Sequence, residues 1–199
     1  MKKHYSFFGI LLAVLVFMGQ GCILLGGNNT NTSGPAGMFV STDKGENWQP
    51  ISSMPTTDGV KSLSGVSVFK LIEDINDSKA LYWASRQHGL YYSFDDGKSW
   101  RQADSEFKAG FVRAIAVHPK DKCKIYASNG RQVFKTDDCM RSWTEVFFEA
   151  RPSDSITSLS FDPFSSSTIY LTENNGDMLK SVDEGTSWAV AYRFGGYVR

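Results

Sequence analysis

The sequence predicts an all-β fold, a partial β-propeller built from four-stranded antiparallel blades. An eight-residue frame, S-x-D-x-G-x-x-W, recurs along the chain, and its aspartates lie 52, 43 and 45 residues apart. A period of this length is typical of propeller blades and solenoid units. The aromatic content of 14% and the 18 glycines suit a protein of short strands and many tight turns.

The frame occurs three times in complete form and once in altered form, in which Thr136 replaces the serine and Met140 the glycine. Its constant positions are Ser41, Asp43, Gly45 and Trp48; Ser93, Asp95, Gly97 and Trp100; Thr136, Asp138 and Trp143; and Ser181, Asp183, Gly185 and Trp188. We expect a hairpin loop in which the hydroxyl and carboxylate oxygens accept hydrogen bonds from loop N–H groups. The glycine supplies a backbone conformation that other residues adopt at a cost, and the tryptophan packs against the blade.

These frames resemble the Asp-box, or BNR, repeats of sialidases, sortilin-like receptors and photosystem II assembly-factor-like propellers, over about residues 37–199. In those families the box lies on the outer rim of each blade, away from the ligand face. The resemblance therefore implies a structural role for the frame residues. We expect no metal and no cofactor, because the acidic stretch at 95–97 lacks the ligand spacing of an EF-hand loop.

Residues 1–22 have the pattern of a targeting segment, with two lysines followed by an apolar run from Phe7 to Met18. The stretch that ends in Cys22 resembles a bacterial lipoprotein signal, which implies cleavage before Cys22 and diacylation of its thiol. Gly19 departs from that pattern, since an apolar residue is usual there. An uncleaved membrane anchor and ordinary secretion are the alternatives. All three interpretations predict an exported domain, and the lipoprotein signal places that domain at the cell membrane surface.

Residues 23–37 are rich in Gly, Asn, Thr and Ser and are predicted to form a flexible linker. The propeller is expected over 38–199, as a half-blade at 38–52, full blades at about 66–104, 111–149 and 156–193, and the start of a further blade at 196–199. We predict that the first strand of each blade lines the central channel. The ring is expected to be incomplete at the C-terminal end; a four-bladed closure and completion by a second chain are the alternatives.

The unit at 111–149 shows the strands most clearly, and it also contains Cys123 and Cys139. A two-residue turn at Asn129-Gly130 would set Cys123 opposite Thr136, close enough to Cys139 for a disulfide. An oxidising compartment outside the cytoplasm fits such a bond. Two free thiols are the alternative.

Lys70, Arg113 and Arg199 align with one another at the starts of inner strands. They are predicted either to form a basic ring facing the channel or, in the interpretation that we favour, to be solvated strand ends. His118 is interpreted as a polar residue at a strand end. The formal net charge is zero, which gives no indication of a nucleic-acid partner.

The sequence predicts no catalytic residue, because the carboxylate pairs and the arginine cluster of sugar-cleaving propellers are not recognisable. We therefore expect a membrane-tethered scaffold for protein binding or assembly, with an unidentified protein partner. One alternative is that the chain is part of a carbohydrate-active enzyme, a sialidase or other glycoside hydrolase whose catalytic residues lie in further blades. In that case the ligand would be a carbohydrate. A purely structural surface protein is the other.

Overall fold

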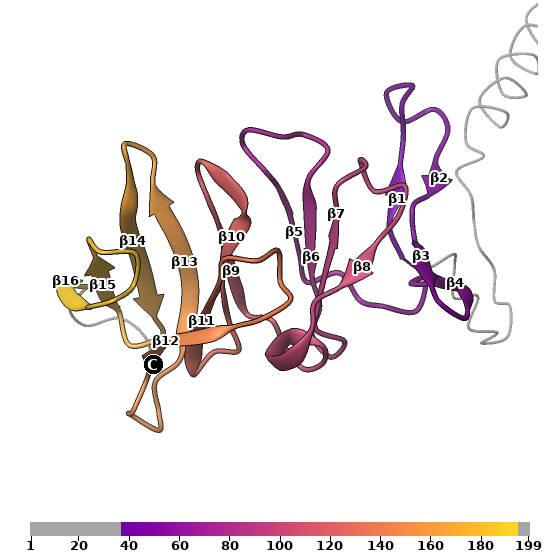
Figure 1. Ribbon diagram of the computed structural model, residues 1–199. Helices are drawn as coiled ribbons and strands as arrows, with labels where there is room; N and C mark the ends of the chain where they lie inside the picture. Colours follow the sequence, from indigo (N-terminus) through magenta and orange to yellow (C-terminus); the bar gives the residue numbers. More distant parts are fainter. Residues whose placement is uncertain (1–36, 195–199) are drawn as a thin grey trace, which may run out of the picture. The chain divides into compact units, whose positions relative to one another are not determined.

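The computed structural model describes residues 37–194, and in this part of the chain it contains sixteen β-strands (Figure 1). Three four-stranded antiparallel sheets follow one another, each with its strands in sequence order. This confirms the prediction of an all-β partial propeller with four-stranded antiparallel blades. The predicted targeting segment with Cys22, most of the predicted linker, and the predicted strand start at 196–199 with Arg199 lie outside the described residues.

The three complete sheets are the first, second and third blades. The first contains β5 (Lys70–Glu73), β6 (Leu81–Ala84), β7 (Leu90–Ser93) and β8 (Arg101–Gln102). The second contains β9 (Ala114–His118), β10 (Asp121–Ser128), β11 (Gln132–Thr136) and β12 (Thr144–Phe148). The third contains β13 (Ile156–Asp162), β14 (Ser165–Glu173), β15 (Asp177–Ser181) and β16 (Ala189–Arg193). A 3₁₀ turn, η1 (Ser105–Phe107), links the first two blades.

Two short hairpins precede the first blade. β1 (Phe39–Val40) pairs with β2 (Gln49–Pro50) and forms the predicted half-blade. β3 (Ser53–Thr56) pairs with β4 (Gly59–Ser62), a hairpin that the sequence analysis did not predict. All four residues of β4 are exposed, so the alternation that marks a half-buried strand is missing there.

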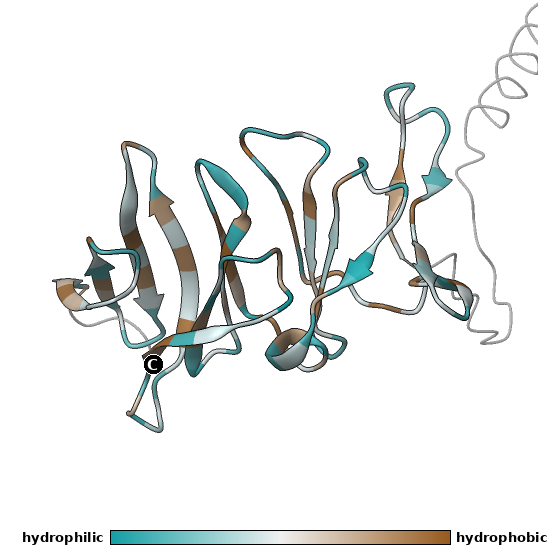
Figure 2. Cartoon of the chain, in the orientation of Figure 1, coloured by the Kyte–Doolittle hydropathy of each residue, from teal (hydrophilic) through white to brown (hydrophobic). Residues whose placement is uncertain are grey.

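The core lies between neighbouring sheets, in three clusters. The first cluster joins the half-blade to the first blade through Met38, Leu63, Trp83, Tyr91 and Trp100. Successive residues of a strand point to opposite faces, so one strand serves two clusters. In β9, Ile115 packs toward the first blade, whereas Ala114 and Ala116 pack toward the third. Figure 2 shows apolar residues in brown alternating with paler, more polar ones along β13, whose Ile156 and Leu159 belong to the cluster with the second blade.

The four frame loops (41–48, 93–100, 136–143 and 181–188) have one hydrogen-bonding pattern. In each, the hydroxyl of the first residue donates to the frame aspartate at 2.7 or 2.8 Å. It also accepts the N–H group four residues later. The aspartate in turn accepts both the N–H and the side chain of the residue four positions after itself. The loop is therefore closed from within by one hydroxyl and one carboxylate.

Two consecutive residues of every frame loop have positive φ. The fourth position is never glycine and is occupied by Lys44, Asp96, Cys139 and Glu184. The fifth position is glycine in three loops and Met140 in the altered one, at φ 66°. Glycine suits this position for a second reason, close packing: a Cβ on Gly97 would lie 2.8 Å from Cδ1 of Ile51 in the half-blade.

The frame tryptophans tie each blade to the one before it. The indole Nε1 of Trp100 donates to the carbonyl of Ile51 at 2.6 Å, and that of Trp188 donates to the carbonyl of Val146 at 3.0 Å. Both acceptors lie three residues after the tryptophan of the preceding frame loop. Trp143 departs from this: its Nε1 is buried without a partner among the described residues, and its ring packs on Phe107 at 4.7 Å.

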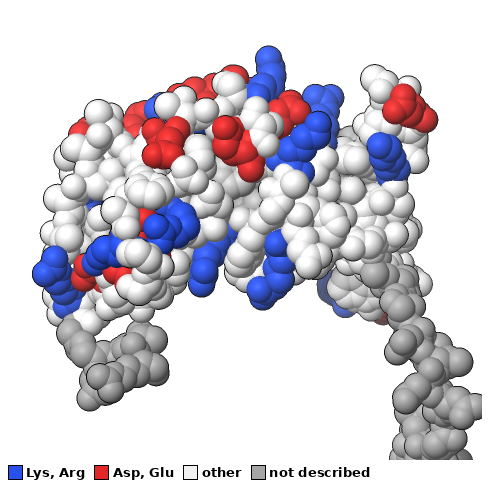
Figure 3. All heavy atoms as spheres, turned by 90° about the horizontal axis from the view of Figure 1, so that it is seen from below, with Lys and Arg blue, Asp and Glu red and all other residues white. Residues whose placement is uncertain are grey.

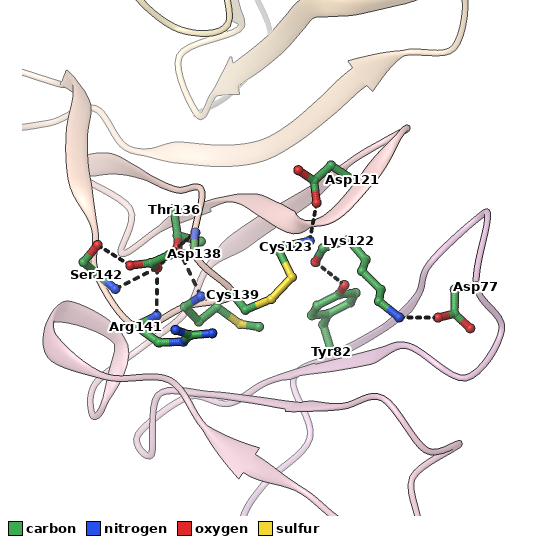
Figure 4. Close-up of a disulfide and its surroundings, with 11 residues drawn as sticks. Asp77, Tyr82, Asp121, Lys122, Cys123, Thr136, Asp138, Cys139, Arg141 and Ser142 are labelled. Carbon is green, nitrogen blue, oxygen red and sulfur yellow. Dashed lines mark hydrogen bonds and ion pairs between the residues drawn. A yellow bond between two sulfur atoms is a disulfide. The ribbon is translucent and has the colours of Figure 1, made fainter.

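A disulfide joins Cys123 in β10 to Cys139 in the altered frame loop (Figure 4). The N–H of Cys139 donates to the carbonyl of Cys123 at 3.2 Å. The predicted register was wrong, because Thr136 pairs with Ile125 and not with Cys123. The turn spans four residues, 129–132, and the Asn129 side chain closes it by accepting the N–H groups of Arg131 and Gln132.

The disulfide closes a loop with a sequence separation of 16. We expect its reduction, or the Cys123→Ser/Cys139→Ser double substitution, to lower the free energy of unfolding by about 3 kcal/mol, because the unfolded chain gains conformational freedom. Urea unfolding with and without reductant measures the difference. Reductant should leave the midpoint of the double variant unchanged. Equal midpoints for the wild type in both conditions would contradict the expectation.

The frame carboxylates predict acid sensitivity. The backbone and side chain of Asn47 lower the pKa of Asp43 to about 2, and the Ser187 side chain with other loop donors lowers that of Asp183 to about 2. A depressed folded-state pKa contributes stability that is present above pH ~4 and is lost as the pH falls toward 2. We expect Asp183→Asn to flatten the fall in melting temperature between pH 5 and pH 2. Asp58→Asn, in the β3–β4 turn, is the control and should follow the wild-type curve.

Candidate functional site

Each blade has two ends that carry different side chains. The frame end carries the frame loops and the connections between the first and second strands. The turn end carries the turns between the second and third strands and the connections that lead into each first strand. Figure 3 views the domain from the turn end and shows Lys and Arg side chains at several points across it. The turn end also brings together the two half-buried phenylalanines described next.

An arginine–phenylalanine cluster, formed by Phe69, Arg86, Phe111 and Arg113, lies at the turn end between the first and second blades. The rings of Phe69 and Phe111 meet edge to face, with centroids 4.8 Å apart. The guanidinium carbon of Arg86 lies 4.6 Å from the Phe69 centroid and 5.6 Å from that of Phe111. Arg113 approaches Phe111 from the second blade at 5.9 Å. Both cations are thus held by ring faces.

The two guanidinium groups keep their N–H donors available. Within residues 37–194, neither Arg86 nor Arg113 has a side-chain hydrogen bond or an ion pair. Arg86 is exposed, and Arg113 is half-buried. A guanidinium that stacks on an aromatic ring and has free donors is arranged to bind a carboxylate or another planar anion in two-point contact.

The backbone around this cluster is held by hydrogen bonds between the blades. The N–H of Gly89 donates to the Gly110 carbonyl at 3.0 Å. The N–H of Val112 donates to the Ser85 carbonyl, also at 3.0 Å. A Cβ on Gly89 would lie 2.1 Å from the Phe107 carbonyl oxygen, so only glycine fits there. The turn that carries Arg86 is therefore fixed to the chain that carries Phe111, which lowers the entropic cost of binding.

A second arginine cluster lies at the turn end of the third blade, centred on Arg151. Its guanidinium pairs with Glu149 at 2.9 Å, with Asp154 at 3.0 Å and with Asp177 at 3.3 Å, and it also contacts the buried Glu173. Burial, followed by the neighbouring Glu149, raises the pKa of Glu173 to about 7. Arg151, in contrast, holds the pKa of Glu149 well below its usual range. This arginine is fully engaged, unlike Arg86.

The frame end carries a groove of about 260 Å³ between the first strands of the three blades. His118 lines it and is buried; its Nδ1 accepts the N–H of Lys120 at 3.2 Å, and its ring meets Phe161 edge to face at 5.2 Å. Burial lowers the pKa of His118. In the described part of the chain, no three His, Cys, Asp or Glu side chains are placed to hold a metal ion. No helix within residues 37–194 combines the length and apolarity that crossing a membrane requires.

Lys70 and Arg113 do not occupy equivalent positions, which a basic ring, the less favoured of the two interpretations, would require; Arg199 lies outside the described residues. Lys70 pairs with Ala84, whereas Arg113 lies two residues before Ile115, which pairs with the corresponding Ala127. The alignment of Lys70 with Arg113 was wrong because it assumed connections of equal length, and the connection between the first and second strands is two residues longer in the first blade. Arg113 does reach the candidate site. Arg86, Phe69 and Phe111 were missed, since an isolated arginine in a turn has no periodic signal.

The Arg151 cluster generates a pH prediction. A folded-state pKa raised to about 7 means that Glu173 contributes stability that is fully present below its unfolded pKa and is lost as the pH rises through 7. We expect Glu173→Gln to raise the melting temperature at pH 8 and to change it little at pH 5. Glu145→Gln, at an exposed position of β12, is the control and should show no such difference. A stabilisation of Glu173→Gln equal at both pH values would contradict the assignment.

Comparisons with known proteins identify the family. The sequence model of the Sortilin-Vps10 family (sortilin, neurotensin receptor 3) matches residues 36–147 and, in an overlapping second match, residues 88–194. The vacuolar protein sorting/targeting protein 10 of Neosartorya fischeri is 37% identical over 71 residues, and that of Aspergillus fumigatus has the same identity over the same length. These matches cover 34% of this chain but only 5% of each fungal protein.

Solved structures show the same fold at low sequence identity. An ancestral GH74 enzyme is 23% identical with a TM-score of 0.60, and covers 77% of this chain and 21% of its own. The GH74 xyloglucanase of Xanthomonas campestris is 21% identical with a TM-score of 0.60, over 83% and 28% of the two chains. YCF48 bound to D1 peptide is 13% identical with a TM-score of 0.51, over 69% and 42%. The family model spans most of the described residues, and this chain therefore belongs to the Sortilin-Vps10 family.

Proposed function

We propose that this chain is a protein-binding propeller that holds an acidic or carboxylate-ending segment of a partner protein at its turn end. The observation that carries this proposal is the exposed guanidinium of Arg86, stacked over Phe69 and Phe111 with its donors free. Arg113 lies against the same Phe111 ring and supplies a second cation. An anionic group that meets both would form charge-assisted hydrogen bonds on a surface that is already ordered.

Family membership and the comparisons support binding rather than chemistry. The fungal relatives are named for protein sorting and targeting, and YCF48, which shares the fold, is bound to a peptide in its structure. The GH74 enzymes share the fold at less than 25% identity, so no residue role is transferred from them. The chain covers 5% of each fungal relative and 21%, 28% and 42% of the three solved structures. The binding site proposed here uses only residues of the first two blades.

The proposal includes export and tethering. A targeting segment at 1–22, lipid attachment at Cys22 and a linker at 23–37 would hold the propeller of residues 38–199 outside the cytoplasm. The sorting relatives fit a membrane or secretory-pathway protein, and the disulfide between Cys123 and Cys139 fits an oxidising compartment. The shared hydrogen bonds of the frame loops support the inference that the frames are Asp-box repeats with a structural role.

The test compares peptides that differ only in charge. Binding of the full chain to an array of acidic, neutral and basic peptides, each with a free or an amidated C-terminus, should favour acidic peptides with free carboxylates. Arg86→Ala should weaken that binding by roughly tenfold, the loss expected for one charge-assisted contact. Arg86→Lys should restore only part of it, since an ammonium lacks the planar pair of donors.

Arg101→Ala is the matched control, because Arg101 is an exposed arginine on β8 away from the cluster. It should bind as the wild type does. Equal binding of acidic and basic peptides, or equal losses in Arg86→Ala and Arg101→Ala, would show that the turn end does not recognise anions.

A further inference from the structure

The groove at the frame end combines apolar walls with acidic polar groups. The first strands of the three blades supply its walls, and the connections that follow these strands, at one end of the domain in Figure 1, supply the rest of its lining. Ile72, Ile115 and Leu159 are among the apolar wall residues. Its described lining includes three acidic residues and no lysine or arginine; the acidic residues are Glu73, Asp74 and Asp162.

These three carboxylates have no cationic partner. Within residues 37–194, none of them takes part in an ion pair. Asp162 accepts hydrogen bonds from neutral donors, the N–H of Phe164 at 2.8 Å and the hydroxyl of Tyr170 at 3.2 Å. Asp77, which lies at the same end but does not line the groove, is paired with Lys122 at 2.6 Å (Figure 4). The groove therefore keeps an uncompensated negative charge.

Asp74 is the most buried of the three, with 4% of its surface exposed. Its Oδ1 accepts the N–H groups of Asn76 at 2.8 Å and Asp77 at 3.1 Å. Its Oδ2 is buried and has no hydrogen-bond partner in the described part of the chain. Such an oxygen costs free energy, and a donor that reaches it recovers that cost. His118 lines the same groove, and since burial lowers its pKa, its ring adds no positive charge at pH 7.

Exposed apolar side chains flank the groove on two blades. Ile75, in the connection after β5, lines the groove and is 86% exposed. Phe164 follows the lining residue Pro163 in the connection after β13 and is 97% exposed. Apolar side chains exposed beside a groove are typical of a surface that contacts another protein.

We propose that this groove is a second binding site, and that it holds a lysine side chain flanked by aliphatic residues of a partner protein. The methylene stem of the lysine packs along the apolar walls, and its ammonium group meets Asp74 in the negative potential of Glu73 and Asp162. Lysine fits better than arginine, because Oδ2 is one free acceptor and a guanidinium binds best to two. Ile75 and Phe164 contact the flanking aliphatic residues.

The experiment titrates the full chain calorimetrically with five-residue peptides that have a central lysine between two leucines. Both ends are capped, so these peptides carry no carboxylate that the turn end could bind. Replacing the central lysine by norleucine, which keeps the stem and removes the charge, should weaken binding by roughly tenfold. Replacing it by arginine should weaken binding less. The lysine peptide should also raise the melting temperature of the wild type.

Asp74→Asn removes the charge and keeps an oxygen for the N–H groups of its turn, so it should fold and bind the lysine peptide roughly tenfold more weakly. Glu73→Gln, at an exposed position, should cause a smaller loss. Asp96→Asn is the matched control: Asp96 is an exposed acid in the frame loop of the same blade, and its variant should bind as the wild type does.

The turn-end site is tested separately, because acidic peptides should bind equally to Asp74→Asn and to the wild type. The proposal would be overturned by any of three results. These are no binding of the lysine peptide by the wild type at millimolar concentration, equal binding of the lysine and norleucine peptides, and equal affinities of Asp74→Asn and Asp96→Asn for the lysine peptide.

Discussion

The fold depends on the contact between a frame tryptophan and the outer strand of the preceding blade. A four-stranded sheet has two faces, and an isolated blade in water would leave apolar side chains of both exposed. The tryptophan covers part of that surface and donates its indole N–H to a backbone carbonyl of the neighbour, as Trp100 and Trp188 do. The three core clusters all lie at such junctions. Stability is therefore shared between neighbouring blades, as in other repeat proteins.

The altered frame loop shows how the junction tolerates change. Gly97 packs against Ile51, and Gly185 packs against Val146, so a small frame residue meets a larger residue of the preceding blade. In the altered loop the sizes are exchanged: Met140 is buried in the same cluster as Ala103, at the equivalent position of the first blade. The N–H of Asp104 donates to the Met140 carbonyl at 3.1 Å, and the disulfide holds the loop from its other side.

The sequence predicted the elements that depend on local or periodic signals. The frame loops have a fixed spacing because one hydroxyl and one aspartate must reach particular N–H groups. The strand β9 could be predicted because its apolar residues belong to a core cluster on each face, and β13 because its apolar residues face one cluster. The β3–β4 hairpin was missed because both strands are largely exposed. The alignment of Lys70 with Arg113 was wrong because the connection between β5 and β6 is longer than its counterpart in the second blade. Side-chain hydrogen bonds such as those of Asp74 hold that connection and leave no periodic pattern in the sequence.

The candidate site was harder to predict than the fold. Arg113 was identified from its alignment, but Arg86, Phe69 and Phe111 come from separate turns and connections that only the packed blades bring together. No spacing along the chain indicates that two phenylalanines 42 residues apart will meet. The pairing of Arg151 with several buried carboxylates was likewise invisible, because each carboxylate belongs to a different local pattern.

The acceptor at the Trp100 and Trp188 junctions is a main-chain oxygen, and this has an evolutionary consequence. Every amino acid supplies that oxygen, so the hydrogen bond that joins a duplicated unit to its neighbour requires no matching substitution in the neighbour's sequence. The side chains of Ile51 and Val146 differ in shape, yet the carbonyl of each residue accepts a hydrogen bond from an indole N–H. Gene duplication and recombination can therefore lengthen or shorten such an array one unit at a time, while selection acts on the loops that meet other molecules.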